Sequence, residues 1–201
     1  NGDPAPGWQS EGITITSNTL TYSNLLQSAG LMANNLTLLY NDVDADSIKL
    51  CAQMIDPSAN LLLGQNGLTL GEADIYSIFH SIDAVYNNNL SFLLRRDAMP
   101  GVYLQILHPD GTTGFEGLGT YIDYAWESMQ EPKLIMYPTG NYSVLWSGYE
   151  NDHSSLSHRF VTAAGEIFDA QIPDLPTANA YYNQLCASSI GNVGSLAFNG
   201  N

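Results

Sequence analysis

The stretch Gly101-Val-Tyr-Leu-Gln-Ile-Leu-His108 decides the fold expected from this 201-residue sequence. Its alternating side chains predict a β-strand, and Pro109-Asp-Gly111 predicts a turn directly after it. Beyond the turn, Thr113 and Glu116 have the spacing of a helix capping box. The apolar residues that follow recur with the period of an amphipathic helix: Leu118, Tyr121, Ile122, Ala125, Trp126 and Met129. A strand followed by a helix is therefore expected here.

Working outward, further strands are expected at residues 133–137, 142–149 and 157–172, with a turn at residues 163–165 in the last. Helices are expected at residues 25–39, 47–55, 72–86 and 177–185. The predicted fold class is α+β: a curved antiparallel sheet wrapped around helices, with an N-terminal helical elaboration. Residues 1–70 form an arm and this elaboration, residues 71–172 the core, and residues 173–201 a C-terminal helix and tail. We expect no internal repeat.

The charge balance excludes several classes of partner. The chain has 20 acidic residues and five basic ones, a formal net charge of −15. Such a protein repels phosphate backbones and anionic lipid, so neither nucleic-acid binding nor membrane-surface binding is expected. Membrane insertion is not expected either, because no apolar run approaches the length needed to span a bilayer. The abundance of Asn, Ser, Thr and Tyr favours an extracellular protein, secreted or on the cell surface. Three Asn-x-Ser/Thr triplets, at Asn35, Asn89 and Asn141, permit glycosylation.

The two cysteines, Cys51 and Cys186, are far apart in sequence and lack metal-type spacing. In an extracellular protein they predict one disulfide that ties the C-terminal tail to the N-terminal half. The alternative is two buried free thiols.

Two histidines are candidates for catalysis. His108 shares a strand face with Val102, Leu104 and Ile106, and His158 shares one with Phe160. If both faces line one cavity, His108, His158 and a carboxylate such as Asp110 or Asp169 could act as general acid and base near neutral pH. The alternative is that each histidine caps a strand or binds a backbone carbonyl.

No cofactor is expected, because zinc, nucleotide and haem motifs are absent from the sequence. Asp42, Asp44 and Asp46 imitate the start of an EF-hand calcium loop. Ser47 and Gln53 occupy the positions where that loop needs Gly and Glu, so a solvated capping loop is the preferred interpretation. These aspartates remain only a weak calcium candidate.

Aromatic residues suggest a ligand site. Tyr103, Tyr121, Trp126, Tyr142 and Trp146 gather on the predicted sheet and its helix. Such rings are usually core, but they also suit a small hydrophobic or sugar ligand, since each offers an apolar plane with a polar tip.

The order of elements in residues 71–172 resembles the cone-shaped α+β fold of ketosteroid isomerase, scytalone dehydratase, the polyketide cyclases and the nuclear transport factor family. The resemblance rests on the helix at residues 72–86, the strand ending Leu107-His-Pro-Asp-Gly111, the segment Gly114-Phe-Glu-Gly-Leu-Gly-Thr-Tyr-Ile122 and the turn Ala164-Gly-Glu-Ile167. It implies a deep apolar pocket, no cofactor, and often a dimer. No position matches the isomerase's oxyanion tyrosine or paired acids. An alternative register starts the fold at Leu25 and leaves the helix near Phe115 as an insertion.

The function expected from these features is binding of a small apolar or aromatic molecule by a secreted protein. Cofactor-free lyase or isomerase chemistry follows if His108 or His158 lines the pocket. The rival hypothesis is an extracellular structural or adhesive subunit, a homo-oligomer that assembles through its terminal alternating segments at residues 13–20 and 193–198.

Overall fold

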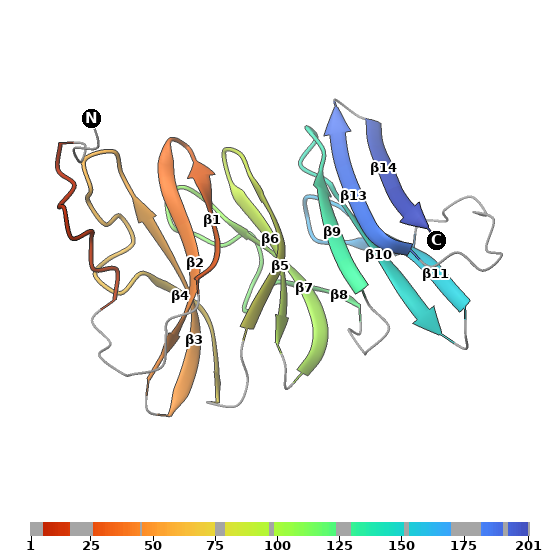
Figure 1. The fold of residues 1–201 in the computed structure, drawn as a ribbon, viewed down its shortest axis with the longest axis horizontal. Coiled ribbons are helices and arrows are strands. Elements are labelled where there is room, and N and C mark those ends of the chain that lie inside the picture. The colour runs from red at the N-terminus through yellow and green to blue at the C-terminus, as the bar shows by residue number, and fades with distance from the viewer. Residues whose placement is uncertain are drawn as a thin grey trace.

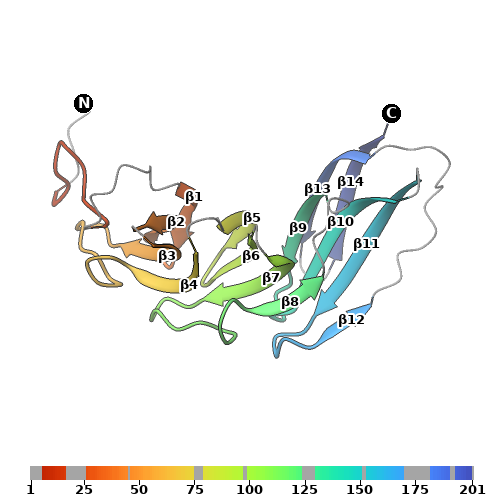
Figure 2. The same ribbon diagram turned by 90° about the horizontal axis from the view of Figure 1, so that it is seen from below.

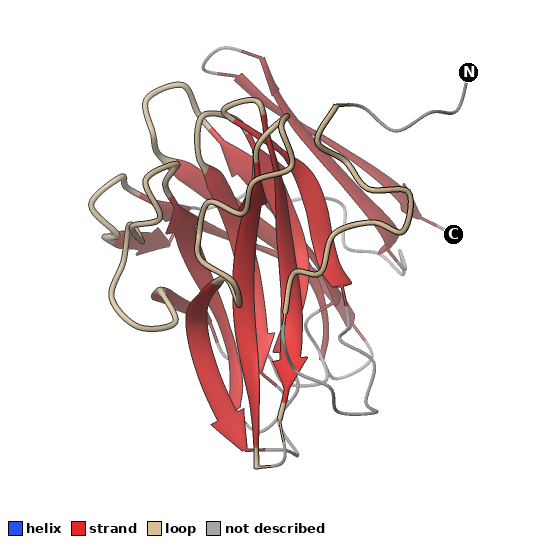
Figure 3. Cartoon of the chain, turned by 90° about the vertical axis from the view of Figure 1, so that its left-hand side faces the viewer, coloured by secondary structure: helices blue, strands red, loops and turns tan. Residues whose placement is uncertain are grey.

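The computed structural model describes residues 6–16, 26–44, 46–74, 79–96, 99–123, 130–150, 153–169, 182–190 and 193–200. Every regular element in these ranges is a β-strand (Figure 3). The described chain is therefore all-β, and the predicted α+β class is wrong. The resemblance to the cone-shaped isomerase fold is wrong for the same reason, because that fold needs its helices. None of the described segments contains a helix that could cross a membrane.

The strands form three four-stranded sheets and a hairpin. The first sheet contains β1 Leu26–Met32, β2 Asn35–Val43, β3 Ser47–Ile55 and β4 Leu68–Asp74. The second contains β5 Phe79–Tyr86, β6 Leu90–Arg96, β7 Met99–Leu107 and β8 Thr120–Asp123. The third contains β9 Gln130–Met136, β10 Tyr142–Glu150, β11 His153–Val161 and β12 Ile167–Asp169. The hairpin consists of β13 Tyr182–Ile190 and β14 Val193–Gly200.

Each sheet is an antiparallel meander in which neighbours in sequence are neighbours in space. Figure 1 shows the sheets side by side in chain order, and Figure 2 shows that they follow a curved path. The first strands of successive units, β1, β5, β9 and β13, lie against one another. Four-stranded meanders whose first strands line a common inner side are arranged like consecutive blades of a β-propeller.

The units repeat at a nearly constant interval. Their first strands begin at Leu26, Phe79, Gln130 and Tyr182, which are 53, 51 and 52 residues apart. The expectation of no internal repeat is therefore wrong. The repeat is difficult to find in the sequence. Equivalent positions of successive units share the same hydrogen bonds and burial, but they seldom carry the same residue type.

The turn between the third and fourth strands shows this most clearly. Its first residue is Asp56, His108 or Thr162, and in all three sheets this residue donates its N–H to the carbonyl four positions later, at 2.9–3.1 Å. Its own carbonyl accepts the N–H of the residue three positions later, at 2.9–3.0 Å. That residue has positive φ, +69° at Ala59, +84° at Gly111 and +85° at Gly165, which explains the two glycines. These turns align the three sheets residue by residue.

Two layers of apolar side chains hold the sheets together, one in each gap between neighbouring sheets. The layer between the first and second sheets is built from Met32, Leu39, Ile48, Leu50, Ala52, Met54, Leu70, Ala73, Phe79, Leu90, Phe92, Leu94 and Leu107. The layer between the second and third is built from Leu93, Val102, Leu104, Ile106, Ile122, Leu134, Tyr142, Val144, Trp146 and Val161. Burial of these side chains is the main force that stacks one sheet on the next.

The predicted strands at residues 101–107, 133–136, 142–149 and 157–161 are confirmed, and so is the turn at residues 163–165. The predicted helices are wrong wherever the structure describes them. Residues 26–32 and 35–39 lie in β1 and β2, and residues 47–55 form β3. β3 is buried almost throughout, because the second sheet covers one face and the loop at residues 63–64 binds Gln53 on the other. It therefore lacks the alternation that marks a half-exposed strand.

The remaining predicted helices are also strand or loop wherever the structure describes them. Glu72 lies in β4, paired with Lys49 of β3, and residues 79–86 form β5. Residues 120–123 form the short edge strand β8, while residues 124–129 lie outside the described ranges. Leu118 and Ile122 pack in different apolar layers, so their helical spacing is coincidental. Of the predicted helix at residues 177–185, the described part belongs to β13.

Cys51 is a buried free cysteine, so the predicted disulfide with Cys186 is wrong. Its Sγ lies 3.9 Å from Oγ1 of Thr69 on the neighbouring strand. Burial raises the pKa of the Cys51 thiol to about 11. Of Cys186 the structure describes only the backbone, in β13.

Candidate binding face on the third sheet

The first predicted catalytic pair, His108 and Asp110, belongs to the turn after β7. Nδ1 of His108 lies 3.1 Å from Oδ1 of Asn89. Oδ1 of Asp110 accepts hydrogen bonds from N–H and Oγ1 of Thr112, at 2.9 and 2.7 Å. These bonds lower the pKa of Asp110. Both side chains are thus engaged in holding the turn.

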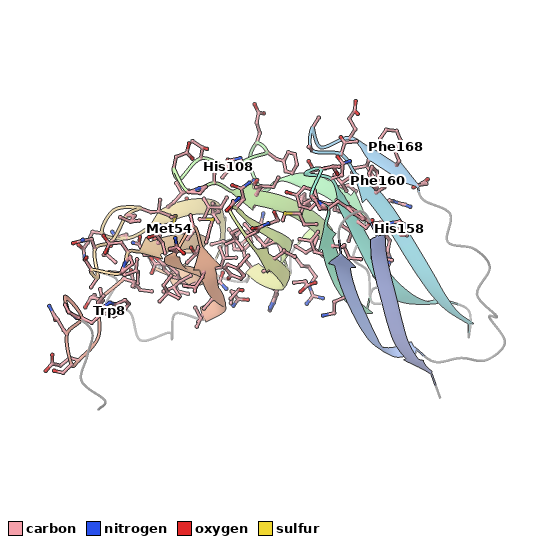
Figure 4. The ribbon with its side chains drawn as sticks, turned by 90° about the horizontal axis from the view of Figure 1, so that it is seen from above. Trp8, Met54, His108, His158, Phe160 and Phe168 are labelled. Atoms are coloured by element: carbon pink, nitrogen blue, oxygen red, sulfur yellow. The ribbon has the colours of Figure 1, made fainter. Side chains whose placement is uncertain are left out.

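The second predicted histidine, His158, lies on β11 in a chain of hydrogen bonds centred on Ser143 of β10. Nε2 of His158 is 2.9 Å from Oγ of Ser143, and the hydroxyl of Tyr137 is 3.0 Å from the same oxygen. Burial lowers the pKa of His158 from its usual 6.5, so the imidazole is neutral at pH 7. Figure 4 shows His108 on the second unit and His158 on the third, so the structure does not bring the two histidines together.

The predicted aromatic ligand residues are also divided between sites. Tyr103 and Tyr121 form an edge-to-face pair with centroids 5.5 Å apart. Tyr142 and Trp146 are buried between the second and third sheets, where the Tyr142 hydroxyl is 3.0 Å from Oγ of Ser91. Trp126 lies outside the described residues.

The aspartates of the weak calcium candidate serve the loop between β2 and β3. Oδ1 of Asp44 accepts the N–H groups of Asp46 and Ser47, and Oδ2 is 3.0 Å from Nζ of Lys49. Oδ1 of Asp42 accepts a hydrogen bond from Thr16 at 3.2 Å. Within the described ranges, no three or more His, Cys, Asp or Glu side chains are grouped so as to hold a metal ion.

A different set of side chains forms a partly exposed surface on the side of the third sheet that faces away from the second. We call it the aromatic face: Tyr137, Ser143, His158, Phe160 and Phe168. Ser143, Phe160 and Phe168 are cross-strand neighbours on β10, β11 and β12. The rings of Tyr137 and Phe160 are 6.3 Å apart and tilted by 45°. Phe168 is 53% exposed, and with its half-buried neighbour Phe160 it forms an exposed apolar patch, which is more informative than a single exposed side chain.

Exposure of this side of the sheet changes from the inner strands to the outer ones. On β9 and β10, Ile135, Ser143 and Leu145 are buried, and β13 of the hairpin lies against these two strands. On β11 and β12, His158 and Phe160 are half-buried and Phe168 is exposed. Figure 4 shows these three side chains following one another along the outer part of the sheet. The aromatic face therefore lies on the same side of the third sheet as the part that β13 contacts, on the strands beyond it.

The repeat shows what happens at the same positions in the other sheets. Counted back from the aligned turns, Phe160 corresponds to Met54 and Ile106, which are 0% and 6% exposed. By the same count His158 corresponds to Ala52 and Leu104, both 0% exposed. In the first two sheets the following sheet covers these positions. In the third sheet they are only half covered.

The aromatic face is suited to binding more than to catalysis. Ser143 lies beside a histidine, as a nucleophile lies beside its base. However, it is 1% exposed, so a substrate has no access to its hydroxyl. The accessible groups are aromatic rings and the edge of a neutral imidazole, which can bury an apolar or aromatic surface and supply a hydrogen bond. Sequence reasoning found His158 and placed Phe160 on the same strand face, but it did not select Tyr137, Ser143 or Phe168 as site residues.

One pattern in the sequence could have led to the residues that were missed. Gln53-Met-Ile-Asp-Pro57 and Gln105-Ile-Leu-His-Pro109 share the pattern Gln-x-Ile/Leu-x-Pro, with the two glutamines 52 residues apart. One more interval of 52 residues leads from Gln105 to Ser157, directly before His158, and the aligned turns place the true counterpart of Gln105 two residues further on, at Arg159. The register alone does not reveal which unit is left uncovered.

The fold and this face together define an all-β repeat protein with a partly exposed apolar surface. No family model matches the chain, and no curated protein matches it either. Among solved structures, it is similar to an endo-arabinase from Bacteroides thetaiotaomicron VPI-5482, with 11% identity and a TM-score of 0.42. That similarity covers 85% of this chain and 72% of the endo-arabinase chain. A likeness of this size does not bear on the function of the chain.

Proposed function

We propose that this chain is a non-catalytic, extracellular binding protein that holds an apolar or aromatic ligand on the aromatic face of its third sheet. The observation that carries the proposal is the exposure of Phe168 beside the half-buried Phe160 and Tyr137. An apolar ligand would remove these rings from water, at a gain of roughly 25 cal/mol per Å² of buried apolar area. The extracellular assignment rests on composition alone.

The absence of catalysis is part of the proposal, and its support is local. The carboxylate of Asp110 and the ring of His108 are engaged in a turn, and the hydroxyl of Ser143 is buried. His158 keeps one polar group at the edge of the face, where it can orient a ligand by a hydrogen bond. Binding selectivity would then come from the shape of three rings and from one imidazole.

The test uses Nile red, a neutral dye whose fluorescence rises in apolar surroundings, so that the charge of −15 does not repel it. We expect the native protein to enhance the fluorescence, and Phe168→Ser to weaken dye binding several-fold. The matched control is Leu31→Ser, because Leu31 is 66% exposed but lies on the first sheet. Equal losses in both variants, or none in Phe168→Ser, would remove the aromatic face as the binding site.

A further inference from the structure

The three Asn-x-Ser/Thr triplets of the sequence occupy one and the same position of the repeat. They begin at Asn35, Asn89 and Asn141, and their hydroxyl residues are Thr37, Ser91 and Ser143. On the third strand of each sheet these hydroxyl residues pair with Met54, Ile106 and Phe160. The aligned turns make Met54, Ile106 and Phe160 equivalent. Triplets that arose by chance would be scattered over the units, so their common register requires another explanation.

The fold does not explain why each unit has a hydroxyl at this position. The three side chains are 0%, 0% and 1% exposed, but their bonds differ. Oγ of Ser91 is 3.0 Å from the hydroxyl of Tyr142, and Oγ of Ser143 is 2.9 Å from Nε2 of His158. Oγ1 of Thr37 has no hydrogen-bond partner among the described residues. A buried hydroxyl without a partner costs stability, and Val would have the same shape without that cost.

The asparagines share their exposure but no common bond. All three are half-buried, next to the turn between the first and second strands of their sheet: Asn35, Asn89 and Asn141. Oδ1 of Asn89 is 3.1 Å from Nδ1 of His108, and Oδ1 of Asn141 accepts the N–H of Ala163 at 3.0 Å. The counterpart of Ala163 in the first sheet is Pro57, which has no N–H to offer Asn35. Both bonds use Oδ1, so they leave the amide nitrogen Nδ2 available.

What the three positions have in common is therefore the chemistry of an acceptor for N-linked glycans. We infer that Asn35, Asn89 and Asn141 each carry such a glycan. Figure 1 shows the turns between the first and second strands at the same end of the three sheets, so the glycans form a row there. This inference rests on the extracellular part of the proposed function, because the glycan donor and its transferase belong to the secretory pathway.

The co-reactant is an oligosaccharide joined through a pyrophosphate to a lipid. Nδ2 of the asparagine forms a bond to the anomeric carbon of the sugar as the bond from that carbon to the pyrophosphate oxygen breaks. The lipid pyrophosphate leaves, and Nδ2 gives up one proton. The transferase acts on the extended chain, so the later burial of Thr37 does not hinder it.

The first test maps the protein recovered from its natural source. Peptide N-glycosidase in heavy-oxygen water converts each glycosylated Asn into a labelled Asp, which mass spectrometry locates. We expect enzyme-dependent label at all three asparagines. Asn66 is the matched control, because it is exposed and precedes Gly67 but lies outside a triplet, so label there reports spontaneous deamidation. Absence of a glycan from any of the three sites would overturn the inference.

The second test separates an acceptor role of Thr37 from a structural one, with variants made in the same cells. We expect Thr37→Val to lose the glycan at Asn35 alone and Thr37→Ser to keep it. After enzymatic removal of the glycans, Thr37→Val should unfold at the same urea concentration as the wild type or at a higher one. A glycan that persists on Asn35 in Thr37→Val, or a lower midpoint of unfolding, would overturn the acceptor role of this triplet.

Nile red binding to the deglycosylated protein tests the proposed function separately. Dye enhancement in a protein whose three asparagines are unmodified would overturn the glycans and leave the binding function intact. Glycans at all three sites without dye enhancement would overturn the binding function and leave this inference intact.

Discussion

Gln53 and Gln105 make the same hydrogen bonds in two successive sheets, although 52 residues separate them. Oε1 of each accepts the N–H of the next residue, at 2.9 Å, and the N–H of a residue in the loop before the fourth strand, at 3.1 Å. Nε2 of each donates to a carbonyl of that loop, at 2.7 Å for Gln53 and 3.0 Å for Gln105. Both side chains are fully buried. The pair shows that these glutamines attach the loop to the third strand.

Replacing either glutamine should therefore destabilise the fold strongly. Gln53→Ala and Gln105→Ala each leave buried backbone groups without partners, and we expect each to lower the free energy of unfolding by about 3 kcal/mol. The control is Gln65→Ala, because Gln65 is exposed, and it should change stability by less than about 0.5 kcal/mol. Urea unfolding of the three variants measures the difference. Similar values for all three would show that the buried bonds contribute little.

Arg159 occupies the same position in the third sheet and makes a different set of contacts. Its guanidinium is 3.2 Å from Oδ2 of Asp123 on the second sheet, also contacts Asp169, and lies 5.8 Å from the centroid of the Trp146 ring. These side chains are partly exposed, so we expect Arg159→Gln to lower stability by about 1 kcal/mol or less. The loss should shrink further in about 1 M salt, where the screening length falls to about 3 Å.

Salt offers the control for this prediction. The loss caused by Gln105→Ala arises from buried neutral groups and should not depend on salt. Unfolding curves of both variants at low and high salt make the comparison. A loss in Arg159→Gln that stays constant with salt would assign the role of Arg159 to packing on Trp146.

The hydroxyls of Ser91 and Tyr142 link the second and third sheets through a buried hydrogen bond of 3.0 Å. We expect Ser91→Ala and Tyr142→Phe to be coupled by about 1 kcal/mol in a double-mutant cycle, because each change removes the partner of the other. Tyr103→Phe combined with Ser91→Ala is the control, since Tyr103 contacts Tyr121 instead. Additive losses for Ser91 and Tyr142 would contradict a direct bond.

The sequence predicts strands well where β-branched and aromatic residues recur and turn residues flank the segment. Residues 101–107 and 142–149 have that character, and both form strands, although the described part of each is largely buried on both sides. It fails at residues 47–55, where Lys49, Leu50 and Met54 are equally good helix formers, and at Leu118 and Ile122, which belong to different apolar layers. The candidate site was even harder to predict from the sequence than the strands. Phe160 is only half-buried because the described hairpin lies against β9 and β10 and leaves β11 partly uncovered, and this is a property of tertiary arrangement that no local pattern encodes.

Cys51 should behave as a structural thiol. Burial raises its pKa to about 11, so little thiolate exists near neutral pH and reagents have no access to it. We expect maleimide to leave the Cys51 peptide unlabelled in the native protein and to label it fully in urea, as read by mass spectrometry. Recovery of a disulfide-linked peptide that joins Cys51 to Cys186 from the unreduced protein would restore the prediction that the structure contradicts.

His158 should make stability depend on pH in a defined direction. Burial lowers its pKa in the folded protein below the 6.5 of an unfolded chain. Between these two pKa values the unfolded state binds more protons, so the free energy of unfolding falls as the pH drops below about 6.5. His158→Gln removes the titration but keeps an amide that can bond to Ser143. The stability difference between wild type and variant should thus shift against the wild type from about pH 7.5 to about pH 5. A difference that is constant over this range would mean that His158 has the same pKa in both states, and hence that it is not desolvated on the aromatic face.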